Sequence, residues 1–212
     1  AQVWVAYVDP EHIRTGGGNQ AAIEQIELIH QLVKTHSGDL ELAGNAGEIT
    51  TIAGSGKIAA LIGVEGGHAI ENSLKNLEKY YELGTRYMTL THNETTDWAD
   101  ASYDLPRHGG LSKFGEKVVL TMNEMGMLVD LSHSSDDTVR DAIRVSKNPV
   151  IASHSSVKAI CPSKRNLTDE LIKGIAGTGG MVMVNFCPLF LHPDGAAIEQ
   201  AYIDRSLELR SL

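Results

Sequence analysis

Short runs of apolar residues alternate with amphipathic stretches along nearly the whole chain. Within each run the residues are apolar almost continuously, rather than at every second position, which is typical of parallel strands buried on both faces. The sequence predicts strands at residues 3–7, 40–43, 59–64, 87–91, 127–131, 150–152 and 181–185. The second of these is short, which leaves six strands of the kind that builds a barrel.

The amphipathic stretches between these runs predict helices. One face of the helix expected at residues 19–36 carries Ile23, Ile26, Ile29 and Val33. Further helices are expected at residues 45–53, 73–83, 114–125, 136–145, 168–175 and 198–209, with Ser73 and Ser135 as N-caps. Strands that alternate with helices through right-handed crossovers predict an α/β fold around a parallel sheet.

The composition changes this picture little. The chain has 212 residues, of which 42% are hydrophobic, enough for one buried domain over residues 1–212. The net charge is −9 without a run of Lys and Arg, which argues against a nucleic-acid partner. We expect neither direct membrane insertion nor a leader peptide in this segment. Two cysteines without a CxxC pair leave the compartment open, with a cytoplasmic location as the working guess.

A metal-binding or hydrogen-bonding side chain follows or closes five successive predicted strands. In chain order these residues are Glu65, His92, His133, His154 and Asn185. The carboxyl ends of parallel barrel strands lie on one rim, so we expect these side chains to converge on a single site. For any one histidine a hydrogen-bonded place in the core is the ordinary alternative, but three at successive strand ends favour a shared function.

These residue types suit a metal centre. Imidazole and carboxylate groups are good zinc ligands, and a catalytic zinc ion keeps one position open for water. A carboxylate can also bridge two metal ions that act together in a hydrolysis. A serine nucleophile is not expected, because the serines around His154 lack a GxSxG frame. Gly66 and Gly67 lack a phosphate-loop pattern and are expected to permit a tight turn.

Other polar residues allow two interpretations each. His68 either supports a metal ligand or caps a helix at the surface, and Asp130 either fills the barrel or supports a ligand. The long segment 93–110 is typical of a functional loop, in which Trp98 and Asp100 either wall a pocket or pin the loop. Arg165 either grips a carboxylate or is a solvated surface residue. We expect the remaining histidines to lie at the surface: His12, His30, His36, His108 and His192.

Five segments in this order resemble the membrane (renal) dipeptidase family of zinc metallopeptidases. They are LIGVEGGHAI, RYMTLTHN with WAD after it, GMLVDLSHSS, VIASHSSVKAICPSKRN and MVMVNF. The resemblance covers nearly the whole chain. It implies a (β/α)8 TIM barrel that holds two zinc ions and hydrolyses the peptide bond of dipeptides through a metal-activated bridging water.

The resemblance also implies a role for each residue of the expected site. Glu65 would bridge both zinc ions, and His133 and His154 would bind one of them. His92 would be catalytic, polarising the scissile carbonyl or steadying the tetrahedral intermediate. Arg165 would bind the free α-carboxylate of the dipeptide substrate.

The chain departs from the family pattern at three points. The first barrel strand, with its His-x-Asp pair, and the eighth strand, with its Asp, have no counterparts, so strands 2 to 7 of an incomplete barrel are expected. Cys187 replaces a Tyr that members of the family can carry. We therefore expect a fragment, or a partner that supplies the missing strands, and a homodimer remains a candidate. Alone, the chain is expected to bind at most one zinc ion well and to show little or no activity.

Two alternatives to a dipeptidase stay open. A related metal-dependent barrel hydrolase could act on N-acyl, lactone or phosphoester substrates, and such a site would not need the guanidinium of Arg165. A catalytically degenerate barrel could bind a ligand without turning it over, although the retained metal-type residues argue against a decayed site.

Overall fold

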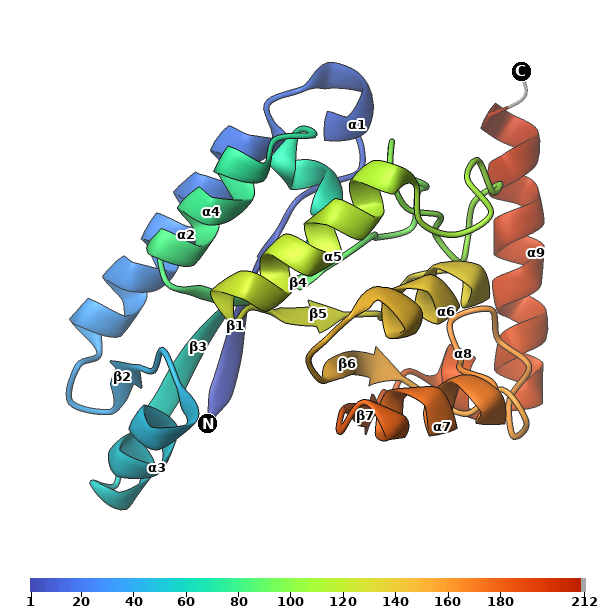
Figure 1. Cartoon of the computed structure of the whole chain (residues 1–212). Coiled ribbons are helices and arrows are strands. Elements are labelled where there is room, and N and C mark those ends of the chain that lie inside the picture. Colours follow the sequence, from blue (N-terminus) through green and yellow to red (C-terminus); the bar gives the residue numbers. More distant parts are fainter. Residues whose placement is uncertain (211–212) are drawn as a thin grey trace.

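Six parallel strands lie next to one another in chain order and form an open arc (Figure 1). The computed structural model describes residues 1–210. The strands are β1 (Gln2–Tyr7), β3 (Ile58–Glu65), β4 (Thr85–Thr89), β5 (Leu128–Asp130), β6 (Val150–Ser155) and β7 (Met181–Val184). A short strand, β2 (Leu40–Leu42), pairs with β3 outside this series. β1 and β7 are the edges of the arc, and the fold is the incomplete α/β barrel that the sequence predicts.

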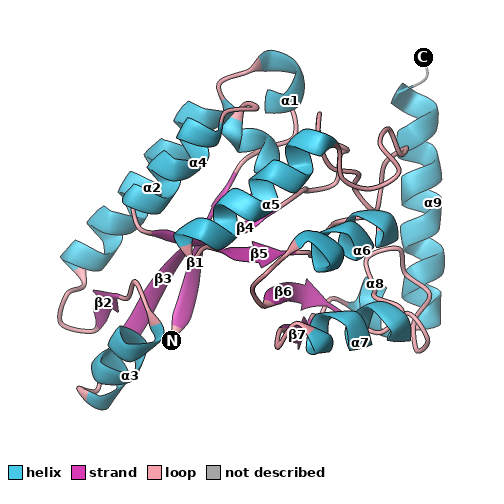
Figure 2. Ribbon diagram, viewed as in Figure 1, coloured by secondary structure: helices cyan, strands magenta, loops and turns pink. Residues whose placement is uncertain are grey.

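Helices between the strands cover the sheet (Figure 2). They are α2 (Gly18–Thr35), α3 (Ala46–Gly54), α4 (Leu74–Glu82), α5 (Lys113–Met125), α6 (Asp136–Val145) and α7 (Asp169–Gly177). From α4 to α7 each helix packs against the next, in the order of the strands. The last helix, α9 (Pro193–Arg210), stands apart from this layer (Figure 1). Three four-residue helices were not predicted: α1 (His12–Thr15), η1 (Gly67–Ile70) and α8 (Pro188–Leu191).

The main hydrophobic core lies between the sheet and these helices. In α2 the buried apolar residues include Ile26, Ile29 and Val33, which confirms the predicted face. β1 packs Ala6 and the partly buried Trp4 against the same core. Burial of such side chains contributes roughly 1.5–3 kcal/mol each to folding, so this layer is the main source of stability.

The edge strands are covered on one face only, which differs from the burial predicted for both faces. In the interior strand β3 residues on both faces are buried. On β1, Val3 and Val5 are exposed, and on β7 so are Met181 and Met183. The interior of a closed barrel is filled by side chains from all its strands. In this open arc β1 and β7 each lack a neighbouring strand on one side, so their side chains are less covered than those of the interior strands.

The ends of several elements differ from the predicted ones. β4 and β5 stop before their expected ends, whereas β6 continues through His154. Ser135 caps α6 by accepting a hydrogen bond from the backbone N–H of Thr138, as predicted, but the side chain of Ser73 makes no capping bond. Within residues 1–210, no helix combines the length and the apolar character needed to span a bilayer.

Candidate metal centre

Three strands bring metal-type side chains together at their carboxyl ends. Glu65 is the last residue of β3 and His154 the last but one of β6, while His133 lies in the turn after β5. The backbone of His133 has a φ of 68°, which is uncommon for a residue other than glycine. Such a conformation persists only where the surroundings impose it, and it is enriched at functional sites.

The side-chain atoms of these residues form a small triangle. The Nε2 atoms of His133 and His154 are 2.9 Å apart, and Oε1 of Glu65 lies 3.3 Å and 3.2 Å from them. Zinc bonds of about 2.0–2.1 Å in a tetrahedral site place neighbouring ligand atoms roughly 3.3 Å apart. The donor types and the spacing therefore fit one zinc ion.

Burial favours the neutral form of His133 and of His92. Loss of solvent, with a smaller contribution from the positive charge of Arg165, holds the pKa of His133 well below its usual 6.5. Burial also lowers the pKa of His92. A histidine must be deprotonated at the coordinating nitrogen to bind a metal, so the environment of His133 favours metal binding at neutral pH.

His92 borders the triangle without joining it. Its ring centroid lies 4.2 Å from that of His133 and 4.8 Å from that of Tyr7, which meets it edge to face. The Nδ1 atom of His92 is buried, and no group within residues 1–210 forms a hydrogen bond with it.

Arg165 lies in the interior, with only 3% of its surface exposed. Its Nη2 donates a hydrogen bond to the backbone oxygen of His154 at 3.2 Å, and its guanidinium lies over the ring of Phe190. The Nε group has no partner, and no carboxylate among the described residues lies within ion-pairing distance. A buried charge without a counter-ion is costly, so this guanidinium is suited to binding an anion from outside.

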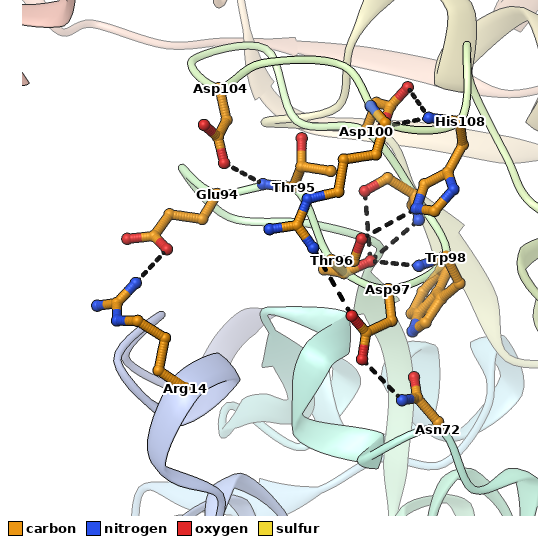
Figure 3. A network of polar contacts seen from close by, with 12 residues as sticks. Arg14, Asn72, Glu94, Thr95, Thr96, Asp97, Trp98, Asp100, Asp104 and His108 are labelled. Carbon is orange, nitrogen blue, oxygen red and sulfur yellow. Dashed lines mark hydrogen bonds and ion pairs between the residues drawn. The ribbon is translucent and has the colours of Figure 1, made fainter. Parts of the chain in front are cut away.

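The loop after β4 is held in place by polar contacts (Figure 3). The buried carboxylate of Asp100 accepts hydrogen bonds from the backbone N–H groups of Arg107, His108 and Gly110. Asp100 therefore acts inside the loop, and Figure 3 shows its carboxylate beside His108.

Packing and ion pairs attach this loop to its neighbours. Trp98 is fully buried and meets the ring of Phe114 edge to face, so it pins the loop. A Cβ atom at Gly67 would lie 2.7 Å from the Trp98 ring, which explains the need for glycine there. At the loop surface, Arg14 of α1 pairs with Glu94 at 2.6 Å (Figure 3).

A cavity of about 160 Å³ opens beside His92. Tyr7, Tyr103 and the α9 residue Tyr202 contribute aromatic walls, and Asp9 contributes a carboxylate. The cavity adjoins the metal-type triangle through His92, so a small substrate could occupy both.

The weaker sequence candidates have distinct surroundings. His68 is buried, and its Nε2 donates to the backbone oxygen of Asp9 at 3.1 Å, so it is not a surface residue. Asp130 is fully buried and bonds to side chains at the strand ends. The Oδ1 atom of Asn185 accepts a hydrogen bond from the backbone N–H of Cys187, so this side chain bonds to a local backbone group.

Three of the histidines expected at the surface, His12, His30 and His108, are half-buried instead. The ring of His30 donates to the backbone oxygen of Leu83, and that of His108 donates to the backbone oxygen of Thr96. The sequence pattern does not predict these hydrogen bonds of His30 and His108, because the accepting residues are distant in the sequence.

Sequence reasoning missed three polar residues around the site. Asn93 and Ser153 contact the rings of His133 and His154, although they are merely neighbours of histidines in the sequence. Glu199 of α9 is buried and accepts hydrogen bonds from Tyr103 and Ser163. Glu199 thereby joins α9 to the segment before Arg165. The sequence does not predict this contact, because a single acidic residue in a helix without a clear apolar face looks like any exposed residue.

The sequence pattern of the membrane dipeptidase family, peptidase family M19, matches residues 1–205. Dipeptidase 3 of Mus musculus is 40% identical over 201 residues, which cover 90% of this chain and 40% of that protein. Dipeptidase verJ of Clonostachys rogersoniana is 42% identical over 168 residues, which cover 79% of this chain and 43% of that protein. The chain thus spans about two fifths of the length of these relatives.

Solved structures share the fold. An amidohydrolase from Pseudomonas aeruginosa is similar with a TM-score of 0.81 and 30% identity, over 91% of this chain and 56% of that one. A metallopeptidase from Rhodobacter sphaeroides, solved with a phosphinate mimic of the dipeptide L-Ala-D-Ala, gives a TM-score of 0.82 and 25% identity, over 91% and 63% of the two chains. With its sequence matched almost from end to end and its metal-type side chains gathered on one rim, the chain belongs to the membrane dipeptidase family of metallopeptidases.

Proposed function

We propose that the protein is a zinc-dependent dipeptidase and that this chain supplies a zinc site made of Glu65, His133 and His154. These residues form the one cluster of three potential ligands found within residues 1–210, so we propose one tightly bound zinc ion for this chain. A zinc ion at this position would supply Lewis-acid activation of water and of a carbonyl group.

The observation that carries the choice of a dipeptide is the buried guanidinium of Arg165. It contacts the backbone of His154 and lacks a carboxylate partner in the described part of the chain. A dipeptide has a free α-carboxylate one residue away from its only peptide bond. Lactones and phosphoesters lack that group, and N-acyl substrates have it only where the acyl group is on an amino acid. We propose that Arg165 binds this carboxylate in bidentate fashion and so places the peptide carbonyl beside the metal ligands.

His92 is the proposed catalytic residue. Its ring lies against that of His133 and lines the adjoining cavity, and its Nδ1 atom has no hydrogen-bond partner within residues 1–210. A neutral imidazole there can donate one hydrogen bond to the carbonyl oxygen as negative charge develops on it, which stabilises the transition state. The phosphinate dipeptide mimic bound to the metallopeptidase from Rhodobacter sphaeroides is consistent with a substrate of this class.

Binding of a phosphinate dipeptide analogue to the zinc-loaded chain tests the proposal directly and requires no turnover. Arg165→Ala is expected to weaken this binding about 10- to 100-fold, because a hydrogen-bonded charge contributes about 1.5–3 kcal/mol. The analogue whose carboxylate is replaced by a carboxamide provides the control, since it should bind wild type and variant alike. Equal binding of the acid to wild type and variant would contradict the proposal and favour a hydrolase that needs no carboxylate.

Zinc content is measured separately on the same preparation. We expect about one zinc ion per chain after dialysis and its loss in His133→Ala. A wild-type chain that retains no zinc would overturn the metal site, independently of the role of Arg165.

A further inference from the structure

The two histidines of the triangle each use the other ring nitrogen for a contact with a polar side chain. Nδ1 of His133 lies 3.0 Å from Oδ1 of Asn93, in the loop after β4. An amide oxygen can only accept a hydrogen bond. The proton of the neutral His133 ring therefore sits on Nδ1, and its Nε2 presents a lone pair.

His154 reaches the same state through a different partner. Its Nδ1 lies 2.8 Å from Oγ of Ser153, and that hydroxyl donates to Oδ2 of Asp130 at 2.6 Å. A hydroxyl has one proton, so Ser153 can only accept from the ring. In the neutral form of His154 the proton therefore also lies on Nδ1, which leaves a lone pair on Nε2.

Asp130 is in turn fixed by its own contacts. It is fully buried in β5 and accepts from Oγ1 of Thr89 at 2.7 Å and from the backbone N–H groups of Ser153 and Ser132 at 2.8 Å and 3.2 Å. Rotation of this carboxylate would break several bonds at once. The hydroxyl of Ser153 consequently has one favoured orientation, which points its lone pairs toward His154.

These contacts leave three acceptor atoms facing one another. The two Nε2 atoms are 2.9 Å apart, and Oε1 of Glu65 is 3.2–3.3 Å from both. In these tautomers of the neutral rings, none of the three atoms carries a proton. Such an arrangement is repulsive unless a cation lies between the atoms. We infer that Asn93 and the Asp130–Ser153 pair are positioning residues, which fix the Nδ1–H tautomers of His133 and His154 and so hold both Nε2 atoms ready for the metal ion. The inference rests on the proposed zinc site and assigns to it supporting residues.

Zinc affinity and tautomer are the two quantities that test this inference. Removal of a side chain that orients a ligand typically weakens metal binding 10- to 100-fold. We expect losses of roughly that size for Asn93→Ala and Ser153→Ala in chelator competition. Asn93→Asp and Ser153→Thr keep an acceptor for the ring proton and should recover most of the affinity. Ser37→Ala, an exposed serine, is the matched control and should bind zinc like the wild type.

Nitrogen-15 spectra of the metal-free chain report the tautomers without any variant. Both rings are expected to show protonated Nδ1 and unprotonated Nε2. Asn93→Ala should alter only the His133 pattern, and Ser153→Ala only that of His154. Rings protonated on Nε2 in the wild type, or unchanged zinc affinity in both folded alanine variants, would overturn the inference. If the wild type binds no zinc at all, the proposed metal site itself fails, and the two failures are thereby distinguished.

Discussion

Burial favours the neutral form of His68, with its single ring proton on Nε2. Its Nε2 donates to a backbone oxygen, while its Nδ1 is buried without a partner in the described part of the chain. A second proton would place an unsatisfied charged N–H in the interior. Burial accordingly lowers the pKa of His68 from its usual 6.5 to about 4.

This pKa makes stability depend on pH. As the pH falls below 6.5 the unfolded chain takes up the proton first, so the native state loses stability until its own pKa near 4 is reached. At about 1.4 kcal/mol per pKa unit, the loss approaches roughly 3 kcal/mol. Urea unfolding at a series of pH values should show a shallower acid decline for His68→Phe than for the wild type. The exposed His36→Gln variant should keep the wild-type slope, and equal slopes for all three would refute the argument.

The residue types at the strand ends predicted the side chains that meet at the candidate site, but not the residues that form hydrogen bonds with them. The positions of Glu65, His133 and His154 at the ends of predicted strands are sufficient to place them on one rim, because the carboxyl ends of parallel barrel strands lie together. The contact between Asn93 and His133 joins residues forty positions apart in different loops. No periodicity or spacing encodes that contact, since it depends on how two loops pack.

At the scale of elements, the loop at residues 93–110 depends on one internal carboxylate. Asp100 is fully buried and accepts from three backbone N–H groups that no helix or strand would satisfy. In Asp100→Ala these groups lose their partner, and a destabilisation of about 2–4 kcal/mol is expected. Chemical unfolding measures this, and limited proteolysis should show earlier cleavage within the loop. The exposed Asp39→Ala is the control, and a comparable loss in both variants would argue against a specific role.

Helix caps provide a second test at this scale, with a control built into the chain. Ser112 caps α5 by accepting a hydrogen bond from the backbone N–H of Gly115, whereas the side chain of Ser73 makes no capping bond to α4. Ser112→Ala should lower the free energy of unfolding by about 1 kcal/mol, and Ser73→Ala by less than about 0.5 kcal/mol. Thermal or urea unfolding of the two variants measures the difference. Equal effects would mean that the cap geometry does not govern these helix ends.

At the scale of the whole molecule, the proposed zinc ion would join three strands. Glu65, His133 and His154 come from the ends of β3, β5 and β6, and the unfolded chain does not hold them together. Zinc at a hundred times its dissociation constant should stabilise the native state by about 2.7 kcal/mol. For a chain of this size that raises Tm by about 5–10 °C.

Calorimetry with and without zinc measures this shift in Tm. His154→Ala should remove most of it, because one of three ligands is lost. An equal shift in the variant would indicate that zinc acts elsewhere on the protein.

The open arc explains why the hydrophobic pattern predicted too much burial for the two edge strands. Apolar runs at residues 3–7 and 181–185 resemble those of the interior strands, yet Val3 and Met181 are largely exposed. The pattern records which residues are apolar, whereas burial depends on what lies opposite them. Interior strands of the arc have neighbours on both sides, and the edge strands β1 and β7 do not.

The sequence by itself determined the alternation of strands and helices, the parallel sheet and the residues at its carboxyl rim, because these follow from local periodicity and from the direction of the chain. Only the tertiary structure decided that Arg165 is buried with no carboxylate of residues 1–210 in ion-pairing distance, that Asp130 reaches His154 through Ser153 and that the edge strands are partly exposed. The physical reason is that burial and hydrogen-bond partners are properties of packed neighbours, which are distant in sequence and are chosen by the fold as a whole.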